Sequence, residues 1–414
     1  MLQNYLKIAW KVLLRRKFFT FISLFGISFT LMILMVATAM IDHVTGPATP
    51  EKRLDRMLFV NFIKMTGKSG NMNTFPSYYY MNHYVKRLKT PEKISVTTTF
   101  RGVNSYVNNK RLSLDLKFTD ANFWEVLDFN FLEGQAFNQQ DQKNANRVAV
   151  ITDHARDQYF GPNVSAVGKY MVADGIRYRV TGVVEDVSYS RFNSYANIWV
   201  PLSTAPYNKN DTGLTGSYMA IILAASKADI PKIKEEYQGI VKQVKLPNPK
   251  EFNKFYSHTE SILEGTIVRQ LLGDGENSGM GKFIAIISIV VFLFMLMPTI
   301  NLVNINVSRI MERSSEIGVR KAFGASSNTL IGQFLVENIF LTLIGGLIGF
   351  LLSALVLEII ANSGLIPYAQ LGLNIRVFGI GLGLSLIFGF ISGVYPAYKM
   401  SKLQAVQALK GGQV

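Results

Sequence analysis

The chain has 414 residues, of which 49% are hydrophobic, a high share for a sequence that also carries 43 basic and 28 acidic side chains. It contains no cysteine, which excludes disulfide bonds and thiol chemistry, so any exported domain has to be stabilised by its own core. The net charge of +15 does not indicate nucleic-acid binding, because basic residues gather beside apolar stretches and elsewhere form no basic run.

The N-terminal segment, residues 1–17, is predicted to form an amphipathic helix. At about 100° per residue, Lys7, Lys11 and Arg15 share one face, and apolar residues such as Leu6 and Trp10 cover the other. This pattern favours a helix in the cytoplasmic membrane interface, with its cations toward lipid phosphates. A plain solvated segment is the alternative.

Four stretches lack Asp, Glu, Lys and Arg, and each has roughly the 20 residues that a helix needs to cross a bilayer. They are Phe18–Ile41, Phe283–Ser308, Asn338–Leu357 and Val377–Tyr398. The predicted spans are 18–41, 283–308, 334–357 and 377–398. Buried helices of a soluble protein are the alternative, but these are usually shorter and carry a polar stripe. The first stretch also resembles a signal peptide, with Ala37-Thr38-Ala39 as its cleavage site, but its apolar run is too long.

Between the first two spans, residues 42–282 are predicted to form an α+β domain. The expected strands are rich in β-branched or aromatic residues: Leu58–Phe62, Ser95–Phe100, Val148–Ile151, Tyr178–Val184, Ile198–Pro201 and Tyr218–Leu223. The expected helices are Ser77–Leu88, Ala121–Val126, Asp153–Phe160 and Ile230–Val244. The predicted fold class is therefore an α-helical membrane protein with four transmembrane helices and an inserted α+β extracytoplasmic domain.

Basic residues predict the orientation of the chain in the membrane, because cytoplasmic loops carry an excess of Lys and Arg. Those flanking the spans are Lys7, Lys11, Arg15, Arg16 and Lys17, then Arg309, Arg313, Arg320 and Lys321, then Lys399, Lys402 and Lys410. Segments 1–17, 309–333 and 399–414, and hence both termini, are predicted to be cytoplasmic. The domain 42–282 and the short loop 358–376 then lie outside.

Glycine and serine recur at four-residue spacing in the last two spans. The third span contains Gly345 and Gly349, and the fourth contains Gly381, Ser385, Gly389 and Gly393. Small residues at this spacing let helix backbones approach closely, within one chain or across a dimer. The alternative is the general abundance of glycine in membrane helices.

Sequence patterns for catalysis are missing. The chain has no Walker motif, no HExxH and no GxSxG, and its four histidines are scattered. The four charge-free stretches also lack the ionisable residues that ion-coupled carriers place within the membrane. No catalytic residue and no metal site is predicted, and the chain is expected not to be an enzyme.

The segment after the second span carries the assignment. It reads Met311-Glu312-Arg313-Ser314-Ser315-Glu316-Ile317-Gly318-Val319-Arg320-Lys321-Ala322-Phe323-Gly324-Ala325-Ser326. It closely resembles the loop E-R-x-x-E-I-G-x-R-[RK]-A-x-G-A of the MacB/FtsX-like permease family of ABC transporters. Residues 121–137 and 178–186 resemble the family's periplasmic core. The tail Tyr395–Leu409 resembles the family ending, with departures at Met400, Ala405 and Gln407.

The resemblance implies a subunit of the bacterial inner membrane that transmits movement and has no channel. A separate dimeric ABC ATPase, holding ATP and Mg, would bind a coupling helix; this chain would bind no cofactor itself. The coupling residues would be Glu312, Arg313, Glu316, Ile317, Gly318, Arg320, Lys321 and Gly324. Other implied partners are membrane lipid, a second permease copy or paralogue, and a periplasmic adaptor or lipoprotein.

The implied function is export or extraction of a peptide, lipoprotein, lipid-linked molecule or drug. An FtsX-like regulator that activates a cell-wall hydrolase is the alternative, although the outer domain is larger than such regulators tend to have. A sensor of antimicrobial peptides is disfavoured, because that branch of the family typically has more spans.

Overall fold

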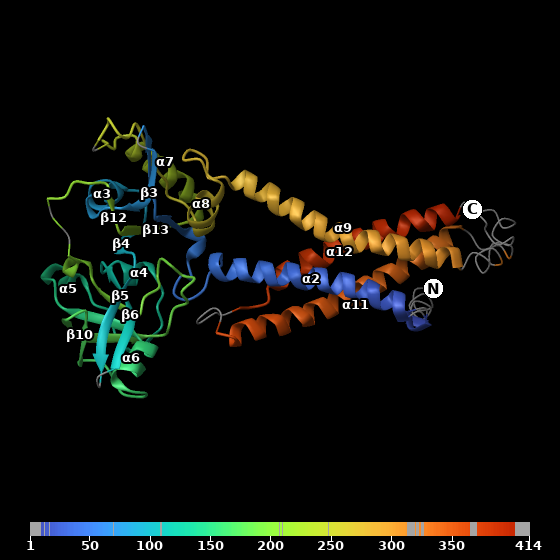
Figure 1. Cartoon of the computed structure of the whole chain (residues 1–414), viewed down its shortest axis with the longest axis horizontal. Coiled ribbons are helices and arrows are strands. Elements are labelled where there is room, and N and C mark those ends of the chain that lie inside the picture. The colour runs from blue at the N-terminus through green and yellow to red at the C-terminus, as the bar shows by residue number, and fades with distance from the viewer. Residues whose placement is uncertain are drawn as a thin grey trace. The chain divides into compact units, whose positions relative to one another are not determined.

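The computed structural model describes residues 10–11, 13–15, 17–68, 70–107, 110–206, 208, 210–246, 248–312, 319, 323, 327–364 and 371–401 (Figure 1). The chain divides into two compact units. One, the helical unit, comprises Met1–Ile41, Ile284–Ser363 and Gln370–Val414. The other, the inserted domain, comprises Asp42–Phe283 and Gly364–Ala369.

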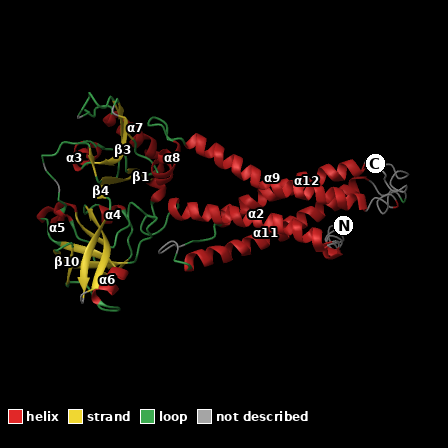
Figure 2. Ribbon diagram, in the orientation of Figure 1, coloured by secondary structure: helices red, strands yellow, loops and turns green. Residues whose placement is uncertain are grey.

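The long helices are α2 (Lys17–Thr45), α9 (Met280–Glu312), α11 (Ser327–Asn362) and α12 (Ile375–Ser401), drawn in red in Figure 2. Within the described residues, three helical stretches are long and apolar enough to cross a bilayer: Lys17–Thr45, Met280–Met297 and Leu335–Asn362. In α12 the described apolar stretch is Ile375–Ile391. The membrane character of the chain is thus supported, and α12 stays a predicted fourth span.

The helical unit has a small core of its own. Ile27 and Leu31 of α2 pack with Met295 of α9 and Leu341 of α11, and Phe388 of α12 packs against this cluster. Most side chains in the apolar part of α9 are exposed, and 6% of that stretch is buried. An apolar helix with so little burial is suited to contact with lipid or with another protein.

Within the described residues, the inserted domain contains a ten-stranded and a four-stranded sheet. The large sheet has the order β1-β13-β4-β6-β11-β8-β10-β7, with β5 paired to β6 and β9 paired to β10. Pairing is parallel between β6 and β11 and between β8 and β10, and antiparallel elsewhere. Its strands are β1 (Met57–Val60), β4 (Lys93–Thr98), β5 (Arg101–Val107), β6 (Lys110–Thr119), β7 (Phe131–Gly134), β8 (Val148–Thr152), β9 (Tyr170–Ala173), β10 (Ile176–Val184), β11 (Ile198–Pro201) and β13 (Tyr218–Leu223).

The small sheet has the order β12-β3-β2-β14. Its strands are β2 (Ile63–Gly67), β3 (Gly70–Pro76), β12 (Thr215–Gly216) and β14 (Lys254–Ser257). The helices of the domain are α3 (Tyr78–His83), α4 (Phe123–Val126), α5 (Gln139–Asn144), α6 (Asp153–Phe160), α7 (Ile230–Val241) and α8 (Arg269–Leu272). Short 3-10 turns are η1 (Leu54–Arg56), η2 (Val85–Arg87), η3 (Leu202–Thr204) and η4 (Lys227–Asp229), and η5 (Ile262–Val268) is a π-helix.

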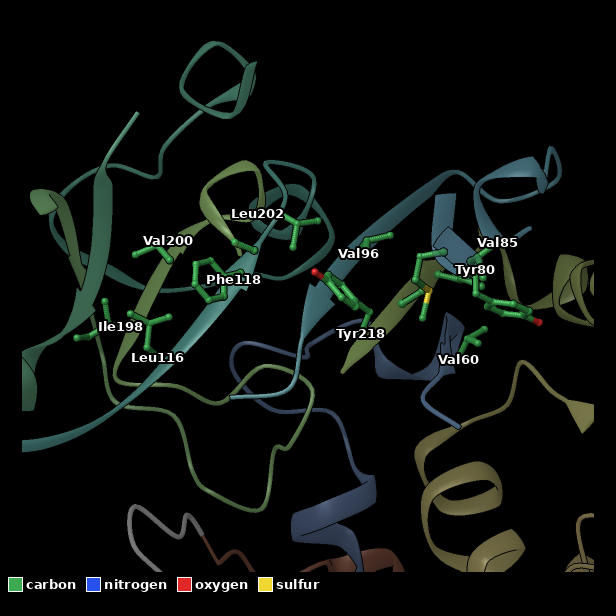
Figure 3. Packing of buried hydrophobic residues seen from close by; sticks show 14 of the residues in the cluster. Val60, Tyr80, Val85, Val96, Leu116, Phe118, Ile198, Val200, Leu202 and Tyr218 are labelled. Carbon is green, nitrogen blue, oxygen red and sulfur yellow. The ribbon is translucent and has the colours of Figure 1, made fainter. Parts of the chain in front are cut away.

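Both faces of the large sheet are buried. Side chains alternate between faces along a strand, so Ile198 and Val200 of β11 join one cluster while Trp199 joins another. Figure 3 shows Ile198 and Val200 beside Leu116 and Phe118 of β6 in the first cluster. A sheet covered on both sides needs nearly continuous apolar strands, which explains why these runs were recognisable in the sequence.

The α+β prediction for the domain is confirmed, with shifts at some ends of elements. The predicted strands at 198–201 and 218–223 and the predicted helix at 153–160 have the observed bounds. The predicted helix 77–88 is instead α3 followed by η2, because the bonds after Tyr84 span three residues rather than four. Ser77 caps α3 by accepting the Tyr80 N–H at 3.0 Å.

Asp120, which directly follows β6, joins this strand to β4 and to the helix α4. Its carboxylate accepts hydrogen bonds from the Ser95 hydroxyl at 2.8 Å and the Val96 N–H at 2.9 Å on β4, and from the Phe123 N–H at 3.2 Å in α4. The Asp120→Ala variant leaves two buried donors, the Ser95 hydroxyl and the Val96 N–H, without this acceptor, whereas the Phe123 N–H keeps its bond to the Asp120 carbonyl oxygen. We expect roughly 2–3 kcal/mol less free energy of unfolding. Denaturant unfolding of the full chain in detergent would measure this loss.

Asp157→Ala is the matched control, because its side chain is 42% exposed and pairs with Arg156. We expect this control to cost less than about 1 kcal/mol. Equal losses in the two variants would contradict the role of Asp120.

Candidate functional site

Most of the predicted coupling helix lies outside the part of the chain that the structure describes. Glu312 is the last residue of α9. The remaining predicted coupling residues lie outside the described part of the chain: Arg313, Glu316, Ile317, Gly318, Arg320, Lys321 and Gly324. The same holds for most of the predicted interfacial helix (1–9, 12 and 16), for 365–370 of the outer loop and for the tail 402–414.

The glycines of the third span lie against α2. A Cβ added at Gly345 would lie 2.9 Å from Cγ2 of Ile27, and one at Gly349 would lie 2.8 Å from the backbone oxygen of Ser28. The latter contact is with backbone, which cannot move aside as a side chain can. The sequence prediction missed Gly346, where a Cβ would lie 2.6 Å from Cδ1 of Leu382 in α12.

The small residues of the fourth span face different neighbours. A Cβ at Gly381 would lie 3.1 Å from Cδ2 of Leu31 in α2, and one at Gly389 would lie 2.8 Å from Oγ1 of Thr342 in α11. Ser385 is buried, with its hydroxyl 3.9 Å from the Met295 sulfur of α9. Gly393 belongs to α12, and its surroundings lie outside the described part. All of these described contacts are within one chain.

A buried ion pair holds the segment that follows α2. Arg191 donates from Nη1 to Oε2 of Glu51 at 3.0 Å and from Nη2 to the carbonyl oxygen of His43 at 3.0 Å. The side chains of Arg191 and Glu51 are 3% and 0% exposed. Ser194 donates from its hydroxyl to the other Glu51 oxygen at 2.8 Å. The last turn of α2 is therefore bound to the loop that leads into β11.

Lys117 of β6 holds the same loop from the sheet side. Its ammonium nitrogen donates to the carbonyl oxygens of Phe192 and Asn193, both at 2.8 Å. Burial lowers the pKa of Lys117 to about 7, and the negative charge of Glu51 opposes this shift. The two backbone carbonyls thus supply the hydrogen bonds that the Lys117 ammonium group loses when it is removed from water.

A second ion pair lies just before α9. Arg269 of α8 donates from Nε to Oε2 of Glu260 at 2.7 Å and from Nη1 to the carbonyl oxygen of Gly275 at 3.1 Å. The Glu260 backbone forms a bridge to Phe59 of β1: the Phe59 N–H donates to the Glu260 carbonyl oxygen at an N to O distance of 2.8 Å, and the Glu260 N–H donates to the Phe59 carbonyl oxygen at 3.1 Å. The π-helix η5 lies between Glu260 and Arg269, so the chain is fixed on both sides of it.

The two connecting segments share one hydrophobic cluster. Ile262, the first residue of η5, is part of the cluster that includes Phe59 and Trp199. Val44, in the last turn of α2, packs against the same cluster. The segments that enter and leave the domain are therefore joined by a common core, which can pass a displacement of one to the other.

Comparison with protein-family models covers both parts of the chain. Residues 20–240 match the MacB-like periplasmic core domain, and residues 288–405 match the FtsX-like permease C-terminal domain. The chain belongs to the MacB/FtsX-like permease family of ABC transporters. The resemblance stated from the loop and tail motifs is therefore confirmed.

The relatives of this MacB/FtsX-like permease include export proteins. It is 25% identical over 411 residues to the pyoverdine export ATP-binding/permease protein PvdT of Pseudomonas fluorescens Pf0-1, a match that covers 97% of this chain and 58% of the relative. It is 24% identical over 318 residues to the macrolide export ATP-binding/permease protein MacB of Mannheimia succiniciproducens, a match that covers 77% of this chain and 46% of the relative. The chain thus spans 58% or less of the length of these relatives.

Two solved structures are similar to parts of this permease. The periplasmic region of MacB from Actinobacillus actinomycetemcomitans is 15% identical, covers 51% of this chain and 92% of that one, and has a TM-score of 0.36. The extracellular domain of the ABC-type transporter YknZ from Gram-positive bacteria is 14% identical, covers 45% of this chain and 93% of that one, and has a TM-score of 0.35.

The Arg191→Met variant tests the ion pair that follows α2. Removing the guanidinium leaves the buried Glu51 carboxylate without its hydrogen-bonded ion-pair partner, so we expect roughly 3–5 kcal/mol less free energy of unfolding. In the double variant Arg191→Met/Glu51→Gln the charge is gone from both sides, and part of the stability should return. The measurement is denaturant unfolding of the full chain in detergent.

The control for this pair is Lys227→Met, which breaks an exposed ion pair with Asp55. The Lys227 side chain is 68% exposed and the Asp55 side chain is 48% exposed. It should cost less than about 1 kcal/mol. If the double variant is no more stable than Arg191→Met alone, the unpaired charge is not the cause.

The Gly349→Ala variant tests the contact between α11 and α2. In a helix this change usually stabilises by about 1 kcal/mol. Here the added methyl group meets the Ser28 carbonyl at 2.8 Å, so we expect a lower thermal unfolding midpoint. Gly383→Ala in α12 is the control, since a Cβ there has no neighbour within 4 Å. A decrease of similar size in both variants would argue against close helix packing.

Proposed function

We propose that the chain is the permease subunit of an ABC transporter that couples ATP hydrolysis by a separate ATPase chain to movement of its periplasmic domain. The family matches on both the inserted domain and the C-terminal helices carry this proposal. Cargo would be exported or extracted from the periplasm or the outer leaflet. The permease itself would bind no cofactor, and ATP and Mg would be held by the ATPase.

The site of ATPase binding in this proposal is the segment 309–333. Glu316, Arg320 and Lys321 place charges of both signs beside small and apolar residues, which suits docking onto a protein surface. Gly318 and Gly324 allow close approach of the backbone. A displacement of this segment would reach α9 directly, because Glu312 ends that helix.

The path of the movement in this proposal runs through the ends of the inserted domain. Arg269 and Glu260 fix the segment before α9, and Arg191 and Glu51 fix the segment after α2. A buried ion pair with additional hydrogen bonds opposes slippage, because separating the charges leaves each desolvated without compensation. Displacement of a helix end should thus move the domain rather than stretch the link.

The proposed setting is the bacterial inner membrane, with four spans and both termini in the cytoplasm. Gly345, Gly349, Gly381, Ser385, Gly389 and Gly393 would pack the helices. A second permease copy or a paralogue would complete the membrane unit, and a periplasmic adaptor or lipoprotein would receive cargo. Should labelling place 309–333 on the same side of the membrane as 43–282, this arrangement is wrong.

The proposed cargo class is a peptide, lipoprotein, lipid-linked molecule or drug. The relatives named for pyoverdine and macrolide export support export as the reaction. The second candidate function is activation of a cell-wall hydrolase, which the FtsX-like match at 288–405 favours. Co-purification separates the two, because a hydrolase bound to the inserted domain supports regulation and an adaptor or cargo molecule supports transport.

The charge reversals Glu316→Lys and Arg320→Glu test the docking of the ATPase. Each should lower permease-dependent ATP turnover by roughly tenfold, which is about 1.4 kcal/mol of docking free energy, because an attractive contact becomes repulsive. Turnover is measured in membranes that contain the chain and its cognate ATPase.

Glu358→Lys, at the other end of α11, is the matched control and should leave this turnover unchanged. Unchanged turnover in the Glu316 and Arg320 variants, with normal membrane levels of the chain, would remove the proposed coupling role.

A further inference from the structure

A cavity of about 130 Å³ lies in the inserted domain at the small sheet. Its lining comes from β2, β3 and β14 on one side and from η5 and α8 on the other; Figure 1 labels β3 and α8. The family resemblance assigns it no role. Part of its wall is formed by η5 and α8, which precede α9 in the chain. An occupant would therefore contact the segment that links the domain to that helix.

The sheet wall of the cavity is one rung of three strands. Lys64 of β2 is paired in register with Asn73 of β3 and with Tyr256 of β14, and all three line the cavity. Residues in register point to the same face of a sheet. This rung presents an ammonium group, an amide and an aromatic ring side by side.

Lys64 supplies the positive charge that the cavity offers to a ligand. Arg269 also lines the cavity, but Glu260 neutralises its charge through two hydrogen bonds. Burial first, and then the nearby Arg269 charge, lower the pKa of His258, which favours its uncharged ring. The described residues include no ion-pair partner for Lys64. A single uncompensated cation at the wall favours an anionic group.

Asn61 supplies an unused acceptor. Its side chain is 4% exposed and donates from Nδ2 to Oγ1 of Thr266 in η5 at 3.2 Å. Its Oδ1 has no hydrogen-bond partner among the described residues. A buried acceptor without a donor costs about 1–3 kcal/mol, so an N–H or O–H donor placed here would be stabilised.

We propose that this cavity binds a small carboxylate whose neighbouring atom carries a neutral N–H or O–H, such as an N-acylated amino acid, a hydroxy acid or a peptide C-terminus. The carboxylate pairs with the Lys64 ammonium, and the N–H or O–H donates to Asn61 Oδ1. Phe59, Phe62 and Tyr256 provide the apolar wall for the remaining atoms. A free α-ammonium group is disfavoured, because it would add a second cation beside Lys64.

The π-helix gives this binding a structural consequence. Thr266 and Gly265 belong to η5, and π-helical turns are rare and frequently lie at functional sites. A ligand held between β2 and η5 fixes the position of η5 relative to the small sheet. Since η5 and α8 precede α9, occupancy of the cavity stiffens the link to that helix.

The test uses the full chain in lipid nanodiscs with N-acetylglycine as the probe and isothermal titration calorimetry as the readout. N-acetylglycine should bind, and N-acetylglycinamide, which lacks the carboxylate, should bind at least about tenfold more weakly. Lys64→Met and Asn61→Leu should each weaken binding by about tenfold or more. Lys254→Met is the charge-matched control on β14, exposed and outside the lining, and should leave binding unchanged.

Several outcomes would overturn the proposal. One is no heat of binding up to about 10 mM probe, a concentration beyond which affinity is negligible. Another is equal weakening by Lys64→Met and Lys254→Met, which would indicate attraction to net charge alone. A third is equal binding of acid and amide. Because Asn61 is buried, Lys64→Met provides the decisive variant if Asn61→Leu does not fold.

The source of the ligand is separated by a second titration with the tripeptide N-acetyl-Ala-Ala-Gly. Tighter binding of the peptide supports a peptide C-terminus, and tighter binding of N-acetylglycine or glycolate supports a free small acid. The assay contains no ATPase, so its result is independent of the proposed transport function.

Discussion

The inserted domain depends on one constraint: the segment that follows α2 and the segment that precedes α9 pack against the same hydrophobic cluster. Val44 lies in the last turn of α2, and Ile262 lies in the segment before α9. Both contact the core formed on one face of the large sheet. A close-packed core transmits strain rather than absorbing it. The ion pairs of Arg191 and Arg269 then determine where each segment is held. Core packing and buried charge thus act together at the same two places.

The apolar strands and the long helices were the most predictable parts of the fold. The run Tyr218–Leu223 is buried throughout, so its sequence is apolar at every position and its bounds could be predicted. Strands such as β2 and β6 were not predicted, because polar residues such as Lys64, Ser113 and Asp115 interrupt them. Such strands form because their neighbours in the sheet complete their hydrogen bonds.

Long-range pairing accounts for what the sequence did not predict about the site. Glu51 and Arg191 are 140 positions apart, and no local pattern links a carboxylate to a guanidinium across that distance. The glycine spacing did predict small surfaces on the last two spans, but not that Gly349 would meet the backbone of Ser28. The coupling residues came from a family resemblance, and most of them lie outside the described part of the chain.

The glycine contacts also make the two helices that flank the inserted domain unequal. At Gly349, α11 lies against the backbone of Ser28 in α2, and at Gly345 it lies against the Ile27 side chain. Small residues at both positions allow this close packing. In the apolar stretch of α9 from Met280 to Met297, by contrast, 6% is buried. Within the helical unit, α2 is therefore the more closely packed of these two helices, and α9 has the more exposed apolar surface. A force on both helices would therefore meet less packing resistance at α9 than at α2.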